Sequence, residues 1–202
     1  MIIIGYQGVG KSSLAGNGRI IDLESGNFWV DGDRSENWYM PYCNIALSLH
    51  RQGYIVFTSS HKVVRDYLKE IANQKDWDAI FVCYPDKELK DAWIHKLRLR
   101  YQETKLDKDY KAWKDAECRF EEAVRELDLC GFKKIHIETM DYELVDLVQN
   151  RVRESFCNMF KTAQCEERCK KKLNQIPCDR VICAADDCLQ ENLFNPWRVT
   201  NE

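Results

Sequence analysis

The sequence predicts an α/β fold in which a five-stranded parallel sheet is sandwiched by helices, and three observations lead to this prediction. Short apolar runs rich in Ile, Val and Phe recur along the chain. Between them lie longer segments whose apolar residues are spaced as on one face of a helix. The first apolar run also leads directly into a glycine-rich stretch and a lysine, which is typical of a strand followed by a phosphate-binding loop.

The N-terminal element is predicted to be a buried strand that ends in the sequence G-x-x-x-x-G-K-S, from Gly5 to Ser12. Glycines let the backbone curl, so that successive amides point inward and form an anion-binding nest at a helix N-terminus. In such a loop Lys11 would reach the β- and γ-phosphates, and Ser12 would hold Mg²⁺. The predicted nucleotide-binding residues are Gly5, Gly8, Val9, Gly10, Lys11, Ser12 and Ser13.

A second strand is expected over residues 19–23, after a helix that Gly16-Asn17-Gly18 stops almost at once. This connection is close to the minimum of about ten residues that a parallel crossover needs. Asp22 and Glu24 then fall at the carboxyl end of the strand, where open α/β sheets bind their ligands. Residues 26–34 contain glycines, aromatic residues and aspartates and are predicted to form an exposed active-site loop.

The rest of the chain to residue 160 continues the alternation of strands and helices. Strands are expected over residues 54–58, 79–84 and 133–137. Helices are expected over residues 35–51, 62–74, 86–101, 109–130 and 142–160. Residues 1–160 are therefore interpreted as one domain.

Composition limits the classes of function. The net charge is −3 and the isoelectric point is near 5.9. This slightly acidic balance does not favour binding to a nucleic-acid duplex or to a membrane surface. No apolar run approaches the roughly 18 residues of a membrane span. We therefore expect a cytoplasmic protein, in which most of the ten cysteines are reduced.

Residues 161–202 form a separate Cys-rich extension with no clear strand pattern. It holds five of the ten cysteines, namely Cys165, Cys169, Cys178, Cys183 and Cys188. No C-x₂-C pair occurs, whereas structural zinc sites prefer that spacing. Free thiols are the favoured interpretation, zinc binding and disulfides are the alternatives, and the extension is a candidate for homo-oligomer contacts.

The order of elements resembles the P-loop small-molecule kinases, that is, the adenylate kinase-like nucleoside and nucleotide kinases with relatives such as shikimate and gluconate kinases. Three places carry the resemblance: the loop from Gly5 to Ser12, the strand at Phe81–Pro85 with its following helix, and the last strand at Phe132–Ile137 with the helix that contains Leu144. The resemblance covers roughly residues 1–160. Of the three matches, the glycine loop is the specific one.

The resemblance implies transfer of the γ-phosphoryl group from ATP, with Mg²⁺, to a small-molecule acceptor. It implies that Lys11 and the loop amides cradle the donor phosphates. It also implies that the helix after Pro85 enters a lid, in which Arg98 or Arg100 neutralises charge as the phosphoryl group moves. Residues 96–114 are locally basic and are expected to form this lid, with a solvated face or a groove for a nucleic-acid strand as the alternatives. If the acceptor is a hydroxyl group, Asp22 or Glu24 is placed to accept its proton.

The sequence departs from the pattern of the family in two ways. The third strand ends in Thr58-Ser59-Ser60-His61 rather than in an aspartate, so the second Mg²⁺ contact is either Ser59, through water, or Asp22. The arginine pair that binds a nucleoside monophosphate is also hard to find. Arg34, Arg51 and Arg65 are candidates only by elimination, which weakens a nucleoside monophosphate as the acceptor.

Other side chains are expected on the acceptor side. His61 and Arg65 lie four residues apart and would share one helical face, either toward substrate or as a cap. Trp29, Trp38 and Tyr39 would stack on a base or sugar, or anchor the core and loops.

The sequence is compatible with three functions. The first is an ATP-dependent phosphotransferase, the second a nucleotide-binding regulator or inhibitor without turnover, and the third a kinase acting within nucleic acid, which is possible but not favoured.

Overall fold

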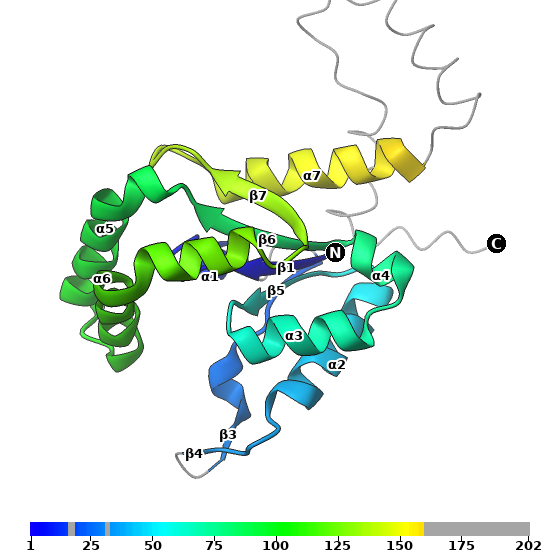
Figure 1. Ribbon diagram of the computed structural model, residues 1–202, viewed down its shortest axis with the longest axis horizontal. Coiled ribbons are helices and arrows are strands. Elements are labelled where there is room, and N and C mark those ends of the chain that lie inside the picture. The colour runs from blue at the N-terminus through cyan, green and yellow to red at the C-terminus, as the bar shows by residue number, and fades with distance from the viewer. Residues whose placement is uncertain (16–18, 31–32, 160–202) are drawn as a thin grey trace, which may run out of the picture.

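The computed structural model describes residues 1–15, 19–30 and 33–159, and the Cys-rich extension lies outside these residues. Five strands form one parallel sheet in the order β2-β5-β1-β6-β7 (Figure 1). The prediction of an α/β fold with a five-stranded parallel sheet flanked by helices is therefore confirmed. The strands are β1 (Ile2–Gly5), β2 (Ile20–Asp22), β5 (Ile55–Ser59), β6 (Ile80–Pro85) and β7 (Lys133–Ile137).

Strand β1 is the centre of the sheet because it pairs with β5 on one side and β6 on the other. Its apolar residues Ile2, Ile3 and Ile4 are fully buried, as expected for a strand that helices cover on both faces. The register aligns Gly5 with Ser59 and with Cys83. All three residues therefore stand at the carboxyl edge of the sheet, where the glycine loop begins.

The helices follow the predicted periodicity, with some differences at their ends. They are α1 (Lys11–Leu14), α2 (Tyr39–Arg51), α3 (Lys62–Ile71), α4 (Gln74–Asp78), α5 (Lys90–Thr104), α6 (Asp107–Asp128) and α7 (Leu144–Met159). The segment predicted as one helix over 62–74 is divided, because Ala72 is extended and Asn73 forms a capping box that starts α4. Helix α2 begins at Tyr39 rather than near residue 35, which places Pro41 in its first turn.

Residues 26–34, predicted as an exposed loop, contain regular structure. A 3₁₀ turn, η1 (Ser25–Phe28), leads into the short antiparallel strands β3 (Trp29–Val30) and β4 (Asp33–Arg34). The pairing register is Trp29 with Arg34 and Val30 with Asp33. This hairpin is separate from the main sheet. Two-residue strands carry too little alternation for a sequence pattern to detect them.

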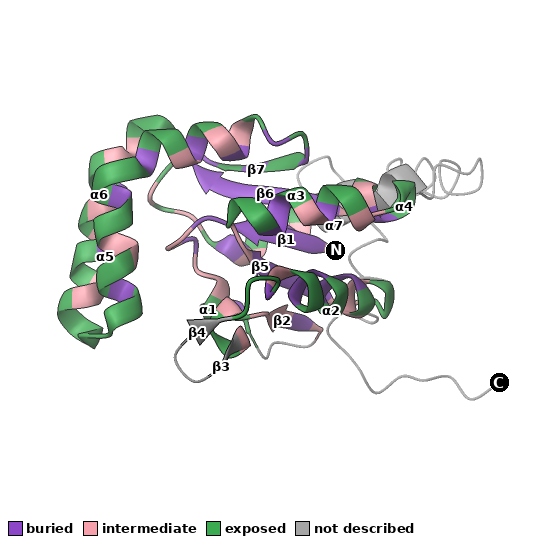
Figure 2. Ribbon diagram, turned by 60° about the horizontal axis from the view of Figure 1, so that its bottom comes forward, coloured by how far each residue is buried: buried purple, intermediate pink, exposed green. Residues whose placement is uncertain are grey.

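Helices α5 and α6 form a hairpin that stands beyond the carboxyl ends of the strands (Figures 1 and 2). Asp109 stabilises the turn between α5 and α6. Its buried carboxylate accepts a hydrogen bond from Thr104 Oγ1 at 2.6 Å and forms an ion pair with Arg100 Nη2 at 2.7 Å. A second short 3₁₀ turn, η2 (Lys87–Leu89), joins β6 to the hairpin. Among the described helices, none combines the length and the apolar character needed to cross a bilayer.

Candidate phosphate-binding site

The glycine loop between β1 and α1 takes a conformation that its glycines make possible. Gly8 and Gly10 have φ of 84° and 97°, in the region that side chains rarely adopt. A Cβ atom on Gly8 would lie 2.8 Å from Leu97 Cδ2 and 3.2 Å from Trp93 Nε1. The loop therefore lies directly against α5, and two of its predicted glycines are required by conformation.

Lys11 begins α1 and turns back across the start of the loop. Its ammonium donates to the carbonyl oxygens of Gly5 at 3.5 Å and Thr58 at 3.4 Å, which are long contacts that a better acceptor can replace. Burial lowers the pKa of Lys11, and the nearby carboxylates of Asp22 and Glu24 oppose that effect. An anion bound in the loop would give the buried Lys11 ammonium a closer and oppositely charged partner.

Ser12 and Asp22 come together although they belong to different elements. The Ser12 hydroxyl donates to Asp22 Oδ2 at 3.0 Å, from the first turn of α1 to the end of β2. Partial burial raises the pKa of Asp22, while Lys11 and the Ser12 hydrogen bond lower it. A hydroxyl beside a carboxylate is an oxygen donor set that suits Mg²⁺, which binds few protein ligands and keeps several waters.

The alternative Mg²⁺ contact, Ser59, has a different partner. Its Oγ lies 2.9 Å from His61 Nδ1. The structure thus brings Asp22, rather than Ser59, to Ser12.

Tyr42 holds the two strand ends that carry these groups, and it is a site residue that the sequence did not predict. Its hydroxyl donates to the carbonyl of Leu23 at 2.7 Å and accepts from the amide of Ser59 at 2.8 Å. It therefore fixes the segment between Asp22 and Glu24 against β5. The residue was identifiable as buried from helical spacing, but its hydroxyl contacts depend on how β2 and β5 pair.

Glu24 lies next to the α5–α6 hairpin. Its carboxylate is half-exposed, and its Oε1 atom lies 3.7 Å from Lys108 Nζ on α6. Glu24 also acts electrostatically on Lys11. Glu24 is therefore on the solvent side of the site, between the glycine loop and the α5–α6 hairpin.

The two predicted lid arginines occupy different positions on α5. Arg100 is held by Asp109, its charge contributes to lowering the pKa of Lys11, and its Nε atom is buried without a hydrogen-bond partner within the described residues. Arg98 is exposed and lies two residues away, which is about 200° around the helix axis. The structure therefore brings Arg100, and not Arg98, to the loop.

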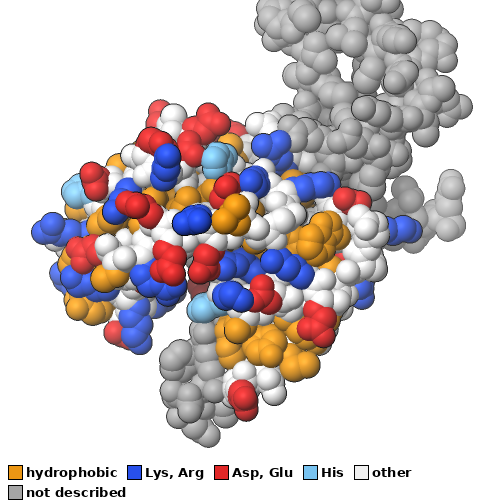
Figure 3. Space-filling model, in the orientation of Figure 1, with side chains coloured by type: hydrophobic (Ala, Val, Ile, Leu, Met, Phe, Trp, Pro, Cys, Tyr) orange, Lys and Arg blue, Asp and Glu red, His pale blue; other side chains and the backbone are white. Residues whose placement is uncertain are grey.

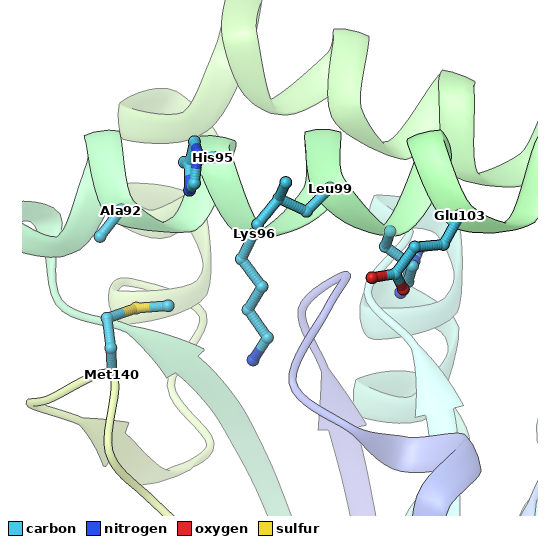
Figure 4. Close-up of a pocket in the computed structure, with 7 residues that line it drawn as sticks. Ala92, His95, Lys96, Leu99, Glu103 and Met140 are labelled. Carbon is cyan, nitrogen blue, oxygen red and sulfur yellow. The ribbon is translucent and has the colours of Figure 1, made fainter.

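A hollow of about 470 Å³ lies beside the loop, between α5 and the connection from β7 to α7. In the close-up view, the Lys96 side chain extends from α5 into this space and Met140 faces it from the opposite side (Figure 4). Burial lowers the pKa of Lys96, and Arg100 adds to the effect. The residues that line the hollow are Ala92, His95, Lys96, Leu99, Arg100, Glu103 and Met140.

The candidate arginines of the acceptor side are engaged elsewhere. Arg51 forms a two-atom contact with Asp76, at 2.7 Å and 3.3 Å. Arg65 is buried, pairs with Glu126 and donates to the carbonyl of Ser60 at 2.9 Å. Arg65 therefore connects α3 to α6 and does not face the ligand edge together with His61, as one of the two expectations had it.

The aromatic candidates pack within the protein. Trp38 is buried, with its ring edge-to-face against Tyr42 and His61 at 5.5 Å in each case. Tyr39 packs on Tyr67 at 5.4 Å. Trp29 and Arg34 belong to the β3–β4 hairpin, and their side chains lie outside the described part of the structure.

In comparisons with known proteins, no protein-family model and no curated protein sequence matches this chain. Across the described residues, no group of three or more His, Cys, Asp or Glu side chains could hold a metal ion. The oxygen pair of Ser12 and Asp22 is of a different kind, because Mg²⁺ takes most of its remaining ligands from water and phosphate. The five cysteines of the proposed zinc alternative lie outside the described residues.

Proposed function

We propose that this protein is an ATP-dependent phosphotransferase with a P-loop NTPase fold, which moves the γ-phosphoryl group of ATP to a small-molecule acceptor. The observation that carries the proposal is the contact between Ser12 and Asp22 at the mouth of a glycine loop that also presents Lys11. The strand order, with this loop leaving the central strand, supports the fold assignment.

The donor site uses the loop and the hollow. The amides from Gly8 to Ser12 and the Lys11 ammonium would cradle the phosphates, since an anion at a helix N-terminus is stabilised by unpaired N–H groups. Lys96 and Arg100 would neutralise charge on the side of α5. The hollow beside Met140 would take the nucleoside, because it combines apolar walls with these two cations.

Asp22 and Glu24 would divide two tasks. Asp22 contacts Ser12 and would help hold Mg²⁺, which when bound neutralises the donor phosphates. Glu24 is closer to solvent, and its pair with Lys108 is long at 3.7 Å, so its carboxylate is placed to accept a proton from an acceptor hydroxyl. The acceptor would then sit between Glu24 and the end of β5.

The surface charge favours a small acceptor over a polynucleotide. Acidic and basic side chains are interspersed on the face of the molecule that includes α6 (Figure 3). Lys111 pairs with Asp107, and Lys114 pairs with Glu117, each at 2.7 Å. Lysines already paired with carboxylates attract a phosphate backbone weakly.

The test is acceptor-dependent formation of ADP from Mg·ATP, with nucleosides, nucleoside monophosphates and short oligonucleotides as acceptors. We expect turnover on one class of acceptor, loss of that turnover in Glu24→Gln and retention in Glu70→Gln, an exposed glutamate near the end of α3. ATP binding should survive in both variants. Binding of ATP without turnover on any acceptor would contradict phosphotransfer and favour a nucleotide-dependent regulator.

A further inference from the structure

The outer side of the glycine loop is held by two aromatic residues from other parts of the chain. The Trp93 indole Nε1 donates to the carbonyl of Gln7 at 2.9 Å. The Tyr142 hydroxyl donates to the carbonyl of Val9 at 3.1 Å. These two carbonyls therefore face away from the space in which an anion would lie.

The two rings support each other. They stack with an interplanar angle of 10° and centroids 6.1 Å apart. Lys96 lies over both, with its ammonium 4.5 Å from the Trp93 ring and 4.9 Å from the Tyr142 ring. Such cation–π contacts stabilise a partly desolvated ammonium.

Lys96 also decides the direction of the hydrogen bonds. Its ammonium lies 3.1 Å from the Tyr142 hydroxyl and can only donate. The single hydroxyl proton of Tyr142 is then directed to the carbonyl of Val9. The result is a chain of donors from Lys96 through Tyr142 to the loop.

We propose that Trp93 and Tyr142, the aromatic clamp, are positioning residues that keep the glycine loop in its anion-binding shape before a ligand arrives. The inference rests on the proposed function for its ligand, a triphosphate. An anion nest needs converging amides, so the carbonyls between them must diverge and find donors on the outside. Trp93 is fully buried, and the clamp supplies both donors from α5 and from the connection before α7.

The clamp also joins the loop to the hollow. Lys96 lines the hollow and bonds to Tyr142, while Trp93 lies three residues before Lys96 on the same helix. A group that fills the hollow would contact Lys96, whose ammonium bonds to the Tyr142 hydroxyl. Phosphate binding and nucleoside binding should therefore be coupled through Tyr142.

The first test compares Tyr142→Phe with Tyr84→Phe. Tyr84 is a matched control, since its hydroxyl donates to Asp128 at 2.7 Å and its side chain is buried away from the loop. Titration calorimetry with Mg·ATP and with inorganic tripolyphosphate should show a Kd about five- to tenfold higher in Tyr142→Phe only, as expected for one lost hydrogen bond. Trp93→Phe, which retains an aromatic ring, should weaken binding in the same direction.

Amide hydrogen exchange of the segment from Tyr6 to Ser13 provides a readout that needs no ligand. We expect faster exchange in Tyr142→Phe than in Tyr84→Phe at equal global stability. Equal exchange and equal affinity in the two variants would overturn the inference. A wild-type protein that binds neither ATP nor tripolyphosphate would overturn the proposed function, and the exchange data would still decide whether the clamp orders the loop.

Discussion

Replacing Gly8 with alanine should destabilise the protein through two separable effects. The residue has φ of 84°, which costs about 1–2 kcal/mol for a side chain in the left-handed region. The new Cβ would also lie 2.8 Å from Leu97 Cδ2. Leu97 is 1% exposed and packed in the core, so it has little room to move, and overpacking of this kind costs about 1–3 kcal/mol.

Gly131 isolates the first effect. Its φ is 88°, nearly the same as that of Gly8, and no atom lies within 4 Å of a Cβ built on it. Gly131→Ala should therefore lose only the conformational part, about 1–2 kcal/mol. Gly8→Ala should lose about 2–5 kcal/mol in total.

Urea unfolding of the three proteins, followed by circular dichroism, measures these free energies. We expect Gly8→Ala to be less stable than Gly131→Ala by at least about 1 kcal/mol, which is the steric part. Equal losses in the two variants would contradict a direct contact between α5 and the loop at Gly8. A loss in Gly131→Ala near zero would refute the conformational part.

Four further predictions concern the site and the core. In steady-state assays of ADP formation, Arg100→Ala should lower kcat on the order of 10²-fold. Arg98→Ala should leave kcat within about twofold of the wild-type value. Equal losses of kcat in the two variants would contradict the assignment of Arg100 to the loop. Asp22→Asn should raise the Mg²⁺ concentration for half-maximal turnover about tenfold, whereas Asp66→Asn, in an exposed pair with Lys62, should not. Gly5→Ala should weaken ATP binding in titration calorimetry, because the new Cβ would lie 2.8 Å from Lys11 Cδ and would displace the Lys11 side chain. Unchanged binding would show that Lys11 can reach the phosphates from another position. Burial lowers the pKa of His50 to about 4, from an ordinary value of 6.5, so this side chain binds fewer protons in the folded state than in the unfolded state between these values. Its contribution to the free energy of unfolding should fall by up to about 3 kcal/mol as pH drops from 6.5 to 4. In urea unfolding, His50→Gln should therefore lose less stability over this range than the wild type, and an equal loss in both proteins would contradict this.

The spacing of apolar residues was sufficient to predict the strands of the sheet and the longer helices. Continuous apolar runs such as Ile2–Ile4 and Ile80–Val82 mark strands that are buried on both faces. The β3–β4 hairpin and the division between α3 and α4 were not predicted, because two-residue strands and a single extended Ala72 leave no periodic pattern. Local capping by Asn73 decided the second case.

The site was predictable where neighbours in sequence make it and less so where distant elements meet. The glycine loop and Lys11 follow from one continuous motif. The contact between Ser12 and Asp22 follows only from the pairing of β2 with β5, so the sequence left Ser59 and Asp22 as alternatives. The clamp residue Tyr142 contacts Val9 across 133 positions, and no local pattern predicts it.

Titration calorimetry of Mg·ATP against the wild-type protein and Lys11→Ala shows whether the glycine loop binds the nucleotide. We predict stoichiometric binding by the wild type and a Kd at least about tenfold higher in Lys11→Ala, because the variant removes the ammonium that would face the phosphates. Binding of equal strength by both proteins would place the nucleotide elsewhere. No binding by a folded wild-type protein would contradict the proposal that this glycine loop is a triphosphate site.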